Sequence, residues 1–308
     1  MYTQVLTDTA FIILPALVAW SAFKVFGGSP VLGIVLGSML ISSSLPNAYQ
    51  VASGDAHPIM FFNFIPVVGY QGTVLPALFV GMIGAKLEQR LRKVIPDALD
   101  LLLTPFLVFL IMSTLGLFVI GPIFHSLENY ILIGTEWILK LPFGIAGIII
   151  GGLQQLIVVT GVHHIFNFLE IQLLAKDGFN QFNPLLSAAV AGQFGAVLAV
   201  GVKTKDKKLK ALALPSALSA ALGITEPAIY GVNLIKGKGK PFLMGLAGGA
   251  AGGFLASVFG LKASGMAVTV IPGILLFLNA QLPLYLVSII VGAGVSFALT
   301  YTFVKLEK

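Results

Sequence analysis

The sequence predicts an all-α protein that crosses a membrane several times, and three observations support this prediction. Of its 308 residues, 57% are hydrophobic and 10% are charged, whereas soluble domains carry about 25% charged residues. The mean hydropathy is +0.99. Most of the apolar residues also lie in runs close to the ~20 residues that a membrane-spanning helix needs.

The apolar runs that are long enough, or nearly long enough, to span a bilayer are 10–26, 30–45, 71–87, 98–124, 143–162, 184–202, 241–260 and 282–304. Three further runs, at 163–175, 211–235 and 263–279, are short or interrupted and do not fit simple spans. We therefore expect about eight or nine transmembrane helices. The segments near 163–175 and 211–235 are expected to be re-entrant.

Basic residues orient these spans. Lysine and arginine cluster at 86–93, 203–210 and 236–240, whereas 45–70 and 125–139 contain neither residue. Short cytoplasmic loops are enriched in lysine and arginine, so the clusters should be cytoplasmic and the two bare stretches external. The same rule accounts for the net charge of +6 without a nucleic-acid partner.

The orientation also predicts that a helix is missing from this chain. If 86–93 is cytoplasmic, counting the spans backward places Met1 outside the membrane. The first apolar run lacks the basic flank and the small-residue cleavage site of a signal peptide. We therefore expect one transmembrane helix that would precede residue 1.

Glu226 is the most informative residue of the sequence. It lies in the string GITEPAIYGVN, Gly223–Asn233, and is the only charged residue between Ala211 and Ile235. An ionisable group at membrane depth costs at least ~2.5–3.5 kcal/mol and marks a functional site by default. Gly223 and Pro227 interrupt the helix around it, and such backbone is tolerated only where it is buried or lines a cavity.

The basic flanks of this segment predict a hairpin. Because both ends of 211–235 should be cytoplasmic, the segment should enter the membrane and return, with Glu226 near its tip, as in many transporter sites. An interfacial helix is the alternative, but the segment has no polar stripe to face water. A carboxylate that merely caps a broken helix is the alternative for Glu226.

A second polar group lies in GLQQLIVVTGVHHIFNFLEIQLL, 152–174. Its polar members are Gln154, Gln155, His163, His164, Asn167, Glu170 and Gln172. Gln155 and His163 are about two helical turns apart and can face one cavity, whereas the two adjacent histidines diverge by ~100°. Gly161 should break the helix just before them. A lone buried histidine is usually structural, but a pair beside amides and an acid indicates that at least one faces a ligand.

The chemistry of these residues suits a neutral polyhydroxylated solute. Gln155, a histidine and Asn167 supply neutral donors and acceptors, and Glu226 supplies one charged acceptor. An ion channel would show rings of carbonyls or repeated carboxylates. The chain has no cysteine and no HExxH spacing, so we expect neither a metal site nor a cofactor.

GITEPAIYGVN and the surrounding run 182–234 resemble the membrane (IIC) component of bacterial sugar phosphotransferase-system permeases, in the glucose–glucoside superfamily. TGVHHIFNFLEIQLL, 160–174, is most similar to the sucrose and trehalose branch. The resemblance extends from about Phe11 to the C-terminus. It implies a multi-pass protein of the bacterial inner (plasma) membrane.

The resemblance also implies an architecture. Family members have ten transmembrane helices, two re-entrant hairpins, a homodimeric assembly and an elevator-type motion. In this chain, 1–140 would be the N-terminal scaffold and dimerisation part, and 141–308 the substrate-binding transport part. Family members begin with an additional apolar helix, so this chain would be a fragment, a truncated product or a naturally shortened protein.

For the site, the resemblance implies that the family glutamate is Glu226, the family histidine is His163 or His164, and the polar position on the preceding helix is Gln155. The candidate substrate-binding residues are thus Glu226, Thr225, His163, His164, Gln155 and Asn167. Glu226 is also the candidate catalytic residue, as general base toward the hydroxyl that is phosphorylated. The phosphoryl group would come from a phosphocysteine on a IIB unit, which must act in trans here.

Three functions follow from these expectations. The first is a sugar-specific IIC permease, the membrane half of a sugar phosphotransferase, for sucrose or another disaccharide; whether to class it as an enzyme stays open. The second is a truncated or sensor-like protein that binds sugar without transport. The third is a facilitative channel that works without phosphorylation. The expected partners are the sugar, a separate phosphorylated IIB protein, membrane lipid and a second copy of the chain.

Overall fold

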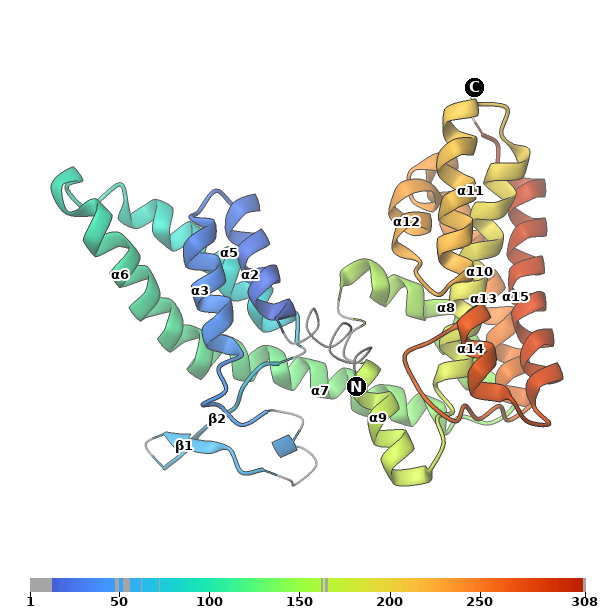
Figure 1. Ribbon diagram of the computed structural model, residues 1–308, viewed down its shortest axis with the longest axis horizontal. Coiled ribbons are helices and arrows are strands. Elements are labelled where there is room, and N and C mark those ends of the chain that lie inside the picture. Colours follow the sequence, from blue (N-terminus) through green and yellow to red (C-terminus); the bar gives the residue numbers. More distant parts are fainter. Residues whose placement is uncertain are drawn as a thin grey trace. The chain divides into compact units, whose positions relative to one another are not determined.

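A computed structural model describes residues 13–47, 50–51, 56–61, 63–71, 73–161, 163 and 166–306 (Figure 1). The described chain is mostly helical. It divides into two compact units, Met1–Ile131 and Leu132–Lys308. The division falls inside one helix, somewhat before the expected boundary at 140.

The N-terminal unit packs its helices around one apolar core. Its elements are α2 (Leu14–Val25), α3 (Pro30–Leu40), β1 (Ile59–Phe61), β2 (Ile65–Val67), α5 (Leu75–Leu91), α6 (Asp97–Leu115) and the π-helix η1 (Gly116–Ile120), followed by α7 (Gly121–Leu139), which crosses into the second unit. The fully buried side chains include Phe23, Leu36, Val80 and Met112. The two strands pair antiparallel, with Ile59 opposite Val67.

The C-terminal unit holds the polar strings that the sequence singled out. Its elements are α8 (Ile145–Thr160), α9 (Phe166–Asp177), α10 (Asn183–Lys203), α11 (Lys207–Ala221), α12 (Glu226–Ala228), the π-helix η3 (Ile229–Asn233), the 3-10 helix η4 (Lys236–Gly239), α13 (Lys240–Val258), α14 (Val270–Gly273), the 3-10 helix η5 (Ile274–Phe277) and α15 (Leu282–Phe303). Helices α8, α10, α13 and α15 form a bundle in which α10 is buried along most of its length.

Glycines let α8 and α13 touch backbone to backbone. A Cβ atom added at Gly147 would overlap the carbonyl oxygen of Gly253, and one added at Gly249 would overlap that of Gly151. Gly249 and Gly253 of α13 are four residues apart and so share the face that meets α8, whereas Gly248 and Gly252 meet α15. Small residues at this spacing are how membrane helices approach closely. We call this contact the glycine seam.

In the described residues, four helices are long and apolar enough to cross a membrane: Asp97–Phe124, Asn183–Lys203, Lys236–Val258 and Leu282–Phe303. Shorter apolar helices are Leu14–Val25, Pro30–Leu40, Tyr130–Leu139 and Ile145–Thr160. The predicted mostly helical chain with several long apolar helices is confirmed, but several of the expected spans are shorter than a bilayer requires. The stretch 125–139, expected only as an external loop, is part of α7, because a lack of basic residues does not prevent helix formation.

The re-entrant segments have unequal outcomes. Residues 211–235 contain a reversal of the chain between α11 and α12. Most of 163–175 lies in the single helix α9, so its re-entrance stays a prediction. Another reversal lies at 264–276, where the backbone nitrogen of Ser264 donates to the Leu276 carbonyl over 3.1 Å and so holds the two ends together.

Candidate functional site

The string GITEP forms the turn between α11 and α12. The side chain of Asp206 caps the start of α11 by accepting from the Lys208 nitrogen over 2.8 Å. The helix ends at Ala221, and Gly223 follows with a φ of 97° that favours glycine. Pro227 then occupies the first turn of α12, where its missing N–H costs nothing. Gly223 and Pro227 therefore end one helix and begin the next, and so produce the reversal of the chain.

Both ends of this hairpin lie at the same end of the helical bundle. Lys203, which precedes α11, donates from Nζ to the carbonyl of Val304 over 2.8 Å. Gly237, which follows η3, also lies against Val304, since a Cβ there would overlap the valine side chain. The basic loops 203–210 and 236–240 are thus neighbours, and α11 and α12 run side by side (Figure 1). This is the geometry that a re-entrant hairpin requires.

Two residues of the string fasten the returning arm. Asn233 donates from Nδ2 to Oε1 of Gln193 over 2.9 Å and to its carbonyl over 3.2 Å. Gln193 in turn donates to the carbonyl of Phe242 over 3.2 Å. The Tyr230 hydroxyl donates to the carbonyls of Val158 and Val159 at the end of α8, over 3.3 and 3.2 Å. Neither Tyr230 nor Asn233 was a predicted site residue, although both lie in GITEPAIYGVN.

Glu226 and His163 come together. Oε1 of Glu226 lies 3.8 Å from Nε2 of His163, and their side chains are 47% and 20% exposed. His163 reaches this position because α8 ends at Gly161, whose φ is 78°, as expected. The hairpin tip leaves the Glu226 carboxylate accessible. The pair thus presents a charged acceptor beside an imidazole on an open surface.

The other predicted residues are placed differently. Gln155 is fully buried, and its Nε2 donates to Oε1 of Gln154 over 2.6 Å. It does not share a helical face with His163, because α8 ends before that residue. Thr225 is buried beside Glu226, and Asn167 lies in the first turn of α9. In the described part of the chain, no hydrogen bond joins these three side chains to Glu226.

His164 lies outside the described residues. Its expected difference from His163 therefore stays a prediction. Among the residues that the structure describes, no group of three or more metal-ligating side chains occurs.

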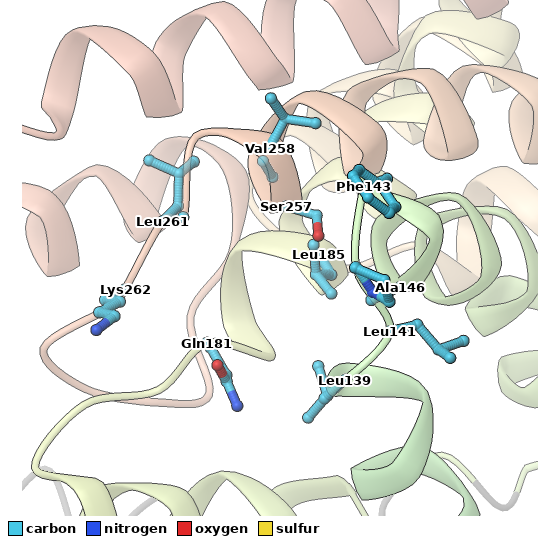
Figure 2. Close-up of a pocket in the computed structure, with 14 residues that line it drawn as sticks. Leu139, Leu141, Phe143, Ala146, Gln181, Leu185, Ser257, Val258, Leu261 and Lys262 are labelled. Carbon is cyan, nitrogen blue, oxygen red and sulfur yellow. The ribbon is translucent and has the colours of Figure 1, made fainter.

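A cavity of about 340 Å³ opens elsewhere in the C-terminal unit. Figure 2 shows Phe143, Gln181, Ser257 and Lys262 around it, where α8 begins and α13 ends. The Tyr230 contact lies at the opposite end of α8, which at 16 residues is ~24 Å long. The cavity holds none of the predicted site residues. Among the predicted site residues, the structure brings the side chains of Glu226 and His163 within 3.8 Å of each other.

The comparison with known families decides which family this chain belongs to. Residues 2–249 match the family described as "Phosphotransferase system, EIIC". The chain belongs to the EIIC family. This confirms the family that the two polar strings indicated.

The relatives of this EIIC chain carry sucrose or trehalose in their names. It is 42% identical to the sucrose-specific EIIBC component of Salmonella typhimurium, over 96% of this chain and 64% of the relative. It is 41% identical to the sucrose-specific EIIBC component of Bacillus subtilis (strain 168), over 86% and 58%. The trehalose-specific EIIBC component of the same organism is 35% identical, over 99% and 66%. The chain thus spans less than two thirds of the length of these relatives.

Proposed function

We propose that this EIIC chain binds and translocates a sugar, sucrose or another disaccharide, with Glu226 and His163 as its principal ligands. The observation that carries this proposal is the 3.8 Å approach of the Glu226 carboxylate to the His163 imidazole on an accessible surface. The two residues belong to the two polar strings of the sequence. The names of the relatives support the choice of a disaccharide.

The chemistry of the pair suits sugar hydroxyls. A carboxylate accepts two hydrogen bonds from adjacent hydroxyls, and an imidazole accepts or donates according to its tautomer. Gln155 stays in the proposed ligand set on the resemblance alone, because its side chain is fully buried, although its Oε1 has no hydrogen-bond partner among the described residues. Thr225 precedes Glu226, and Asn167 lies four residues after His163 in α9. These two residues complete the proposed ligand set.

Transport is proposed to be coupled to phosphorylation by a partner. No residue of the 308 is a cysteine, so the phosphocysteine must lie outside this sequence. The basic loops 203–210 and 236–240 lie together beside the hairpin, and would attract an anionic phosphorylated protein. Glu226 would accept the proton of the sugar hydroxyl as its oxygen bonds to phosphorus, while the sulfur–phosphorus bond of the phosphocysteine breaks and leaves a thiolate on the partner. The homodimer and the elevator-type motion stay part of this proposal.

Binding of sucrose, trehalose, maltose and glucose to the purified protein tests the proposal. We expect a disaccharide to bind most tightly, and Glu226→Gln to weaken it. Failure of all four sugars to bind would overturn the function. Binding without uptake into vesicles that contain the phosphorylated IIB protein would favour the sensor-like alternative.

A further inference from the structure

Glu170 is a buried carboxylate that the proposed function does not use. It lies in α9, and it is 1% exposed. Its Oε1 accepts from Nδ2 of Asn180 over 2.8 Å and from Nδ2 of Asn183 over 2.9 Å. Its Oε2 accepts from the backbone nitrogen of Ala267 over 3.3 Å. All of these contacts use the side chain as an acceptor, which suits a carboxylate and not an amide.

The partners of Glu170 join two distant segments. Asn180 accepts through Oδ1 from the nitrogens of Phe182 and Asn183, both over 3.0 Å, at the start of α10. Its backbone also pairs with Ala263 in both directions, over 2.9 and 2.8 Å. Asn183 donates a further bond to the carbonyl of Val268 over 3.2 Å. Glu170 therefore ties α9 and the start of α10 to the loop 264–270.

That loop has a conformation that needs support. Ala267 and Val270 are not glycines, yet their φ angles are 69° and 53°, and such backbone persists only where its surroundings hold it. The Tyr285 hydroxyl donates to the carbonyl of Val270 over 2.9 Å and lies 3.1 Å from Oγ of Ser187. Glu170 at one end of the strained stretch and Tyr285 at the other hold the loop in place.

The held loop touches the turn that carries Glu226. A Cβ atom built on Gly223 would lie 2.9 Å from Oγ1 of Thr269, closer than side chains tolerate. Gly223 belongs to the turn that leads directly into Glu226. Displacement of Thr269 would therefore remove one wall of that turn.

We propose that Glu170 is a positioning residue, which holds the loop 264–270 against the turn 223–226 and so fixes the site. The effect of Glu170 on sugar affinity rests on the proposed function, whereas its effect on the loop does not. Glu170→Gln keeps the size of the side chain but replaces one acceptor oxygen with an NH2 group, which would face either the Ala267 nitrogen or the asparagine amides, all of which are donors. It must therefore lose the bond to Ala267 or those to the asparagines.

Labelling of a single cysteine tests the effect on the loop. The chain has no native cysteine, so Thr269→Cys offers one thiol to a membrane-permeant maleimide. Glu170→Gln should raise its labelling rate without sugar by about tenfold, the factor expected when a hydrogen bond to a charged group is lost. An unchanged labelling rate would overturn the proposal, whatever the sugar results are.

Glu88→Gln is the matched control. Glu88 is also a buried carboxylate, in α5 of the other unit, and it accepts from the Ser29 nitrogen over 2.6 Å and pairs with Arg92 over 2.8 Å. The Glu88→Gln variant should label at Thr269→Cys within about twofold of the parent rate, because Glu88 shares no hydrogen-bond partner with Glu170. If Glu170→Gln fails to fold, Asn183→Ala removes the bonds to Glu170 and Val268 and should raise the rate in the same direction.

Sugar affinity separates the positioning role from the proposed function. In the native background, Glu170→Gln should weaken binding about tenfold, and Glu88→Gln should leave it within about twofold. If Glu226→Gln abolishes binding and Glu170→Gln does not weaken it, the positioning role fails and the function stands. If the parent protein binds no sugar but Glu170→Gln still speeds labelling, the function fails and the loop contact stands.

Discussion

Glu226 shows how a charge is kept at the tip of a hairpin. Gly223 and Pro227 end one helix and start the next, so the carboxylate projects from a turn and not from the middle of a span. Its side chain is 47% exposed, and access of water to a carboxylate would lower the cost of a charge at membrane depth. The same exposure leaves it free to bind a solute.

Glu226→Gln should weaken sugar binding roughly ten- to a hundredfold. The amide places a donor where a hydroxyl also donates, and a hydrogen bond to a charged group contributes about 1.5–3 kcal/mol. The melting temperature should hardly change, because the Glu226 side chain makes no hydrogen bond with the residues that the structure describes. Titration of purified protein with sucrose and trehalose measures the effect. Parent-like affinity would remove Glu226 from the site.

The two histidines should respond differently to substitution. His163→Ala removes the imidazole 3.8 Å from Glu226 and should lower sugar affinity at least about fivefold. His164→Ala should act mainly on thermal stability, because adjacent residues face different surroundings. Affinities and melting temperatures of both variants, measured side by side, check this. Equal and mild effects on binding would show that neither ring touches the sugar.

At the scale of elements, the hairpin 211–235 is flanked by Lys203 and Gly237, and both of these residues lie beside Val304. Single cysteines at Lys210 and Lys236 should therefore be labelled by an impermeant maleimide from the cytoplasmic side only. The cysteine-free background makes each signal specific. Labelling of the two positions from opposite sides would show that 211–235 is an ordinary span.

The glycine seam should be intolerant of even one methyl group. Gly249→Ala places a Cβ against the carbonyl oxygen of Gly151, and overpacking of this kind costs about 1–3 kcal/mol. Gly294→Ala in α15 is the matched control, because nothing lies within 4 Å of the added atom. Melting temperatures in detergent should fall for the first variant only. Equal stability would mean that α8 and α13 can separate without loss.

For the whole molecule, phosphorylation of the sugar should need a second protein. The chain supplies candidate ligands and a candidate base but no cysteine. Phosphorylated sugar should form only when a phosphorylated IIB protein is added. Its rate should fall as salt is raised from about 0.01 to 0.15 M, because the Debye length shrinks from ~30 to ~8 Å. Product formed by the purified chain alone would refute this division of labour.

The sequence predicted features that depend on nearby helix-ending glycine and proline residues, and it missed those that depend on contacts between distant residues. The reversal between α11 and α12 followed from Gly223 and Pro227, and the end of α8 followed from Gly161, whereas the re-entrance of 211–235 stays a prediction. The burial of Gln155 and the packing of the loop 264–270 did not follow. They depend on contacts such as that of Glu170 with Ala267, which are 97 residues apart. The hydrophobic periodicity of a sequence cannot predict a hydrogen bond between residues so far apart.

Because the glycine seam leaves no room for larger side chains, evolution toward a different sugar has few places to act in this unit. A side chain at Gly147, Gly151, Gly249 or Gly253 would collide with the backbone of the facing helix. Directed evolution for a new specificity should therefore gather its changes in the short connecting segments, 161–167, 223–226 and 264–270. The segments that can change and the helices that cannot would then be encoded by separate stretches of the gene. A new sugar specificity could be transferred by exchanging the three connecting segments.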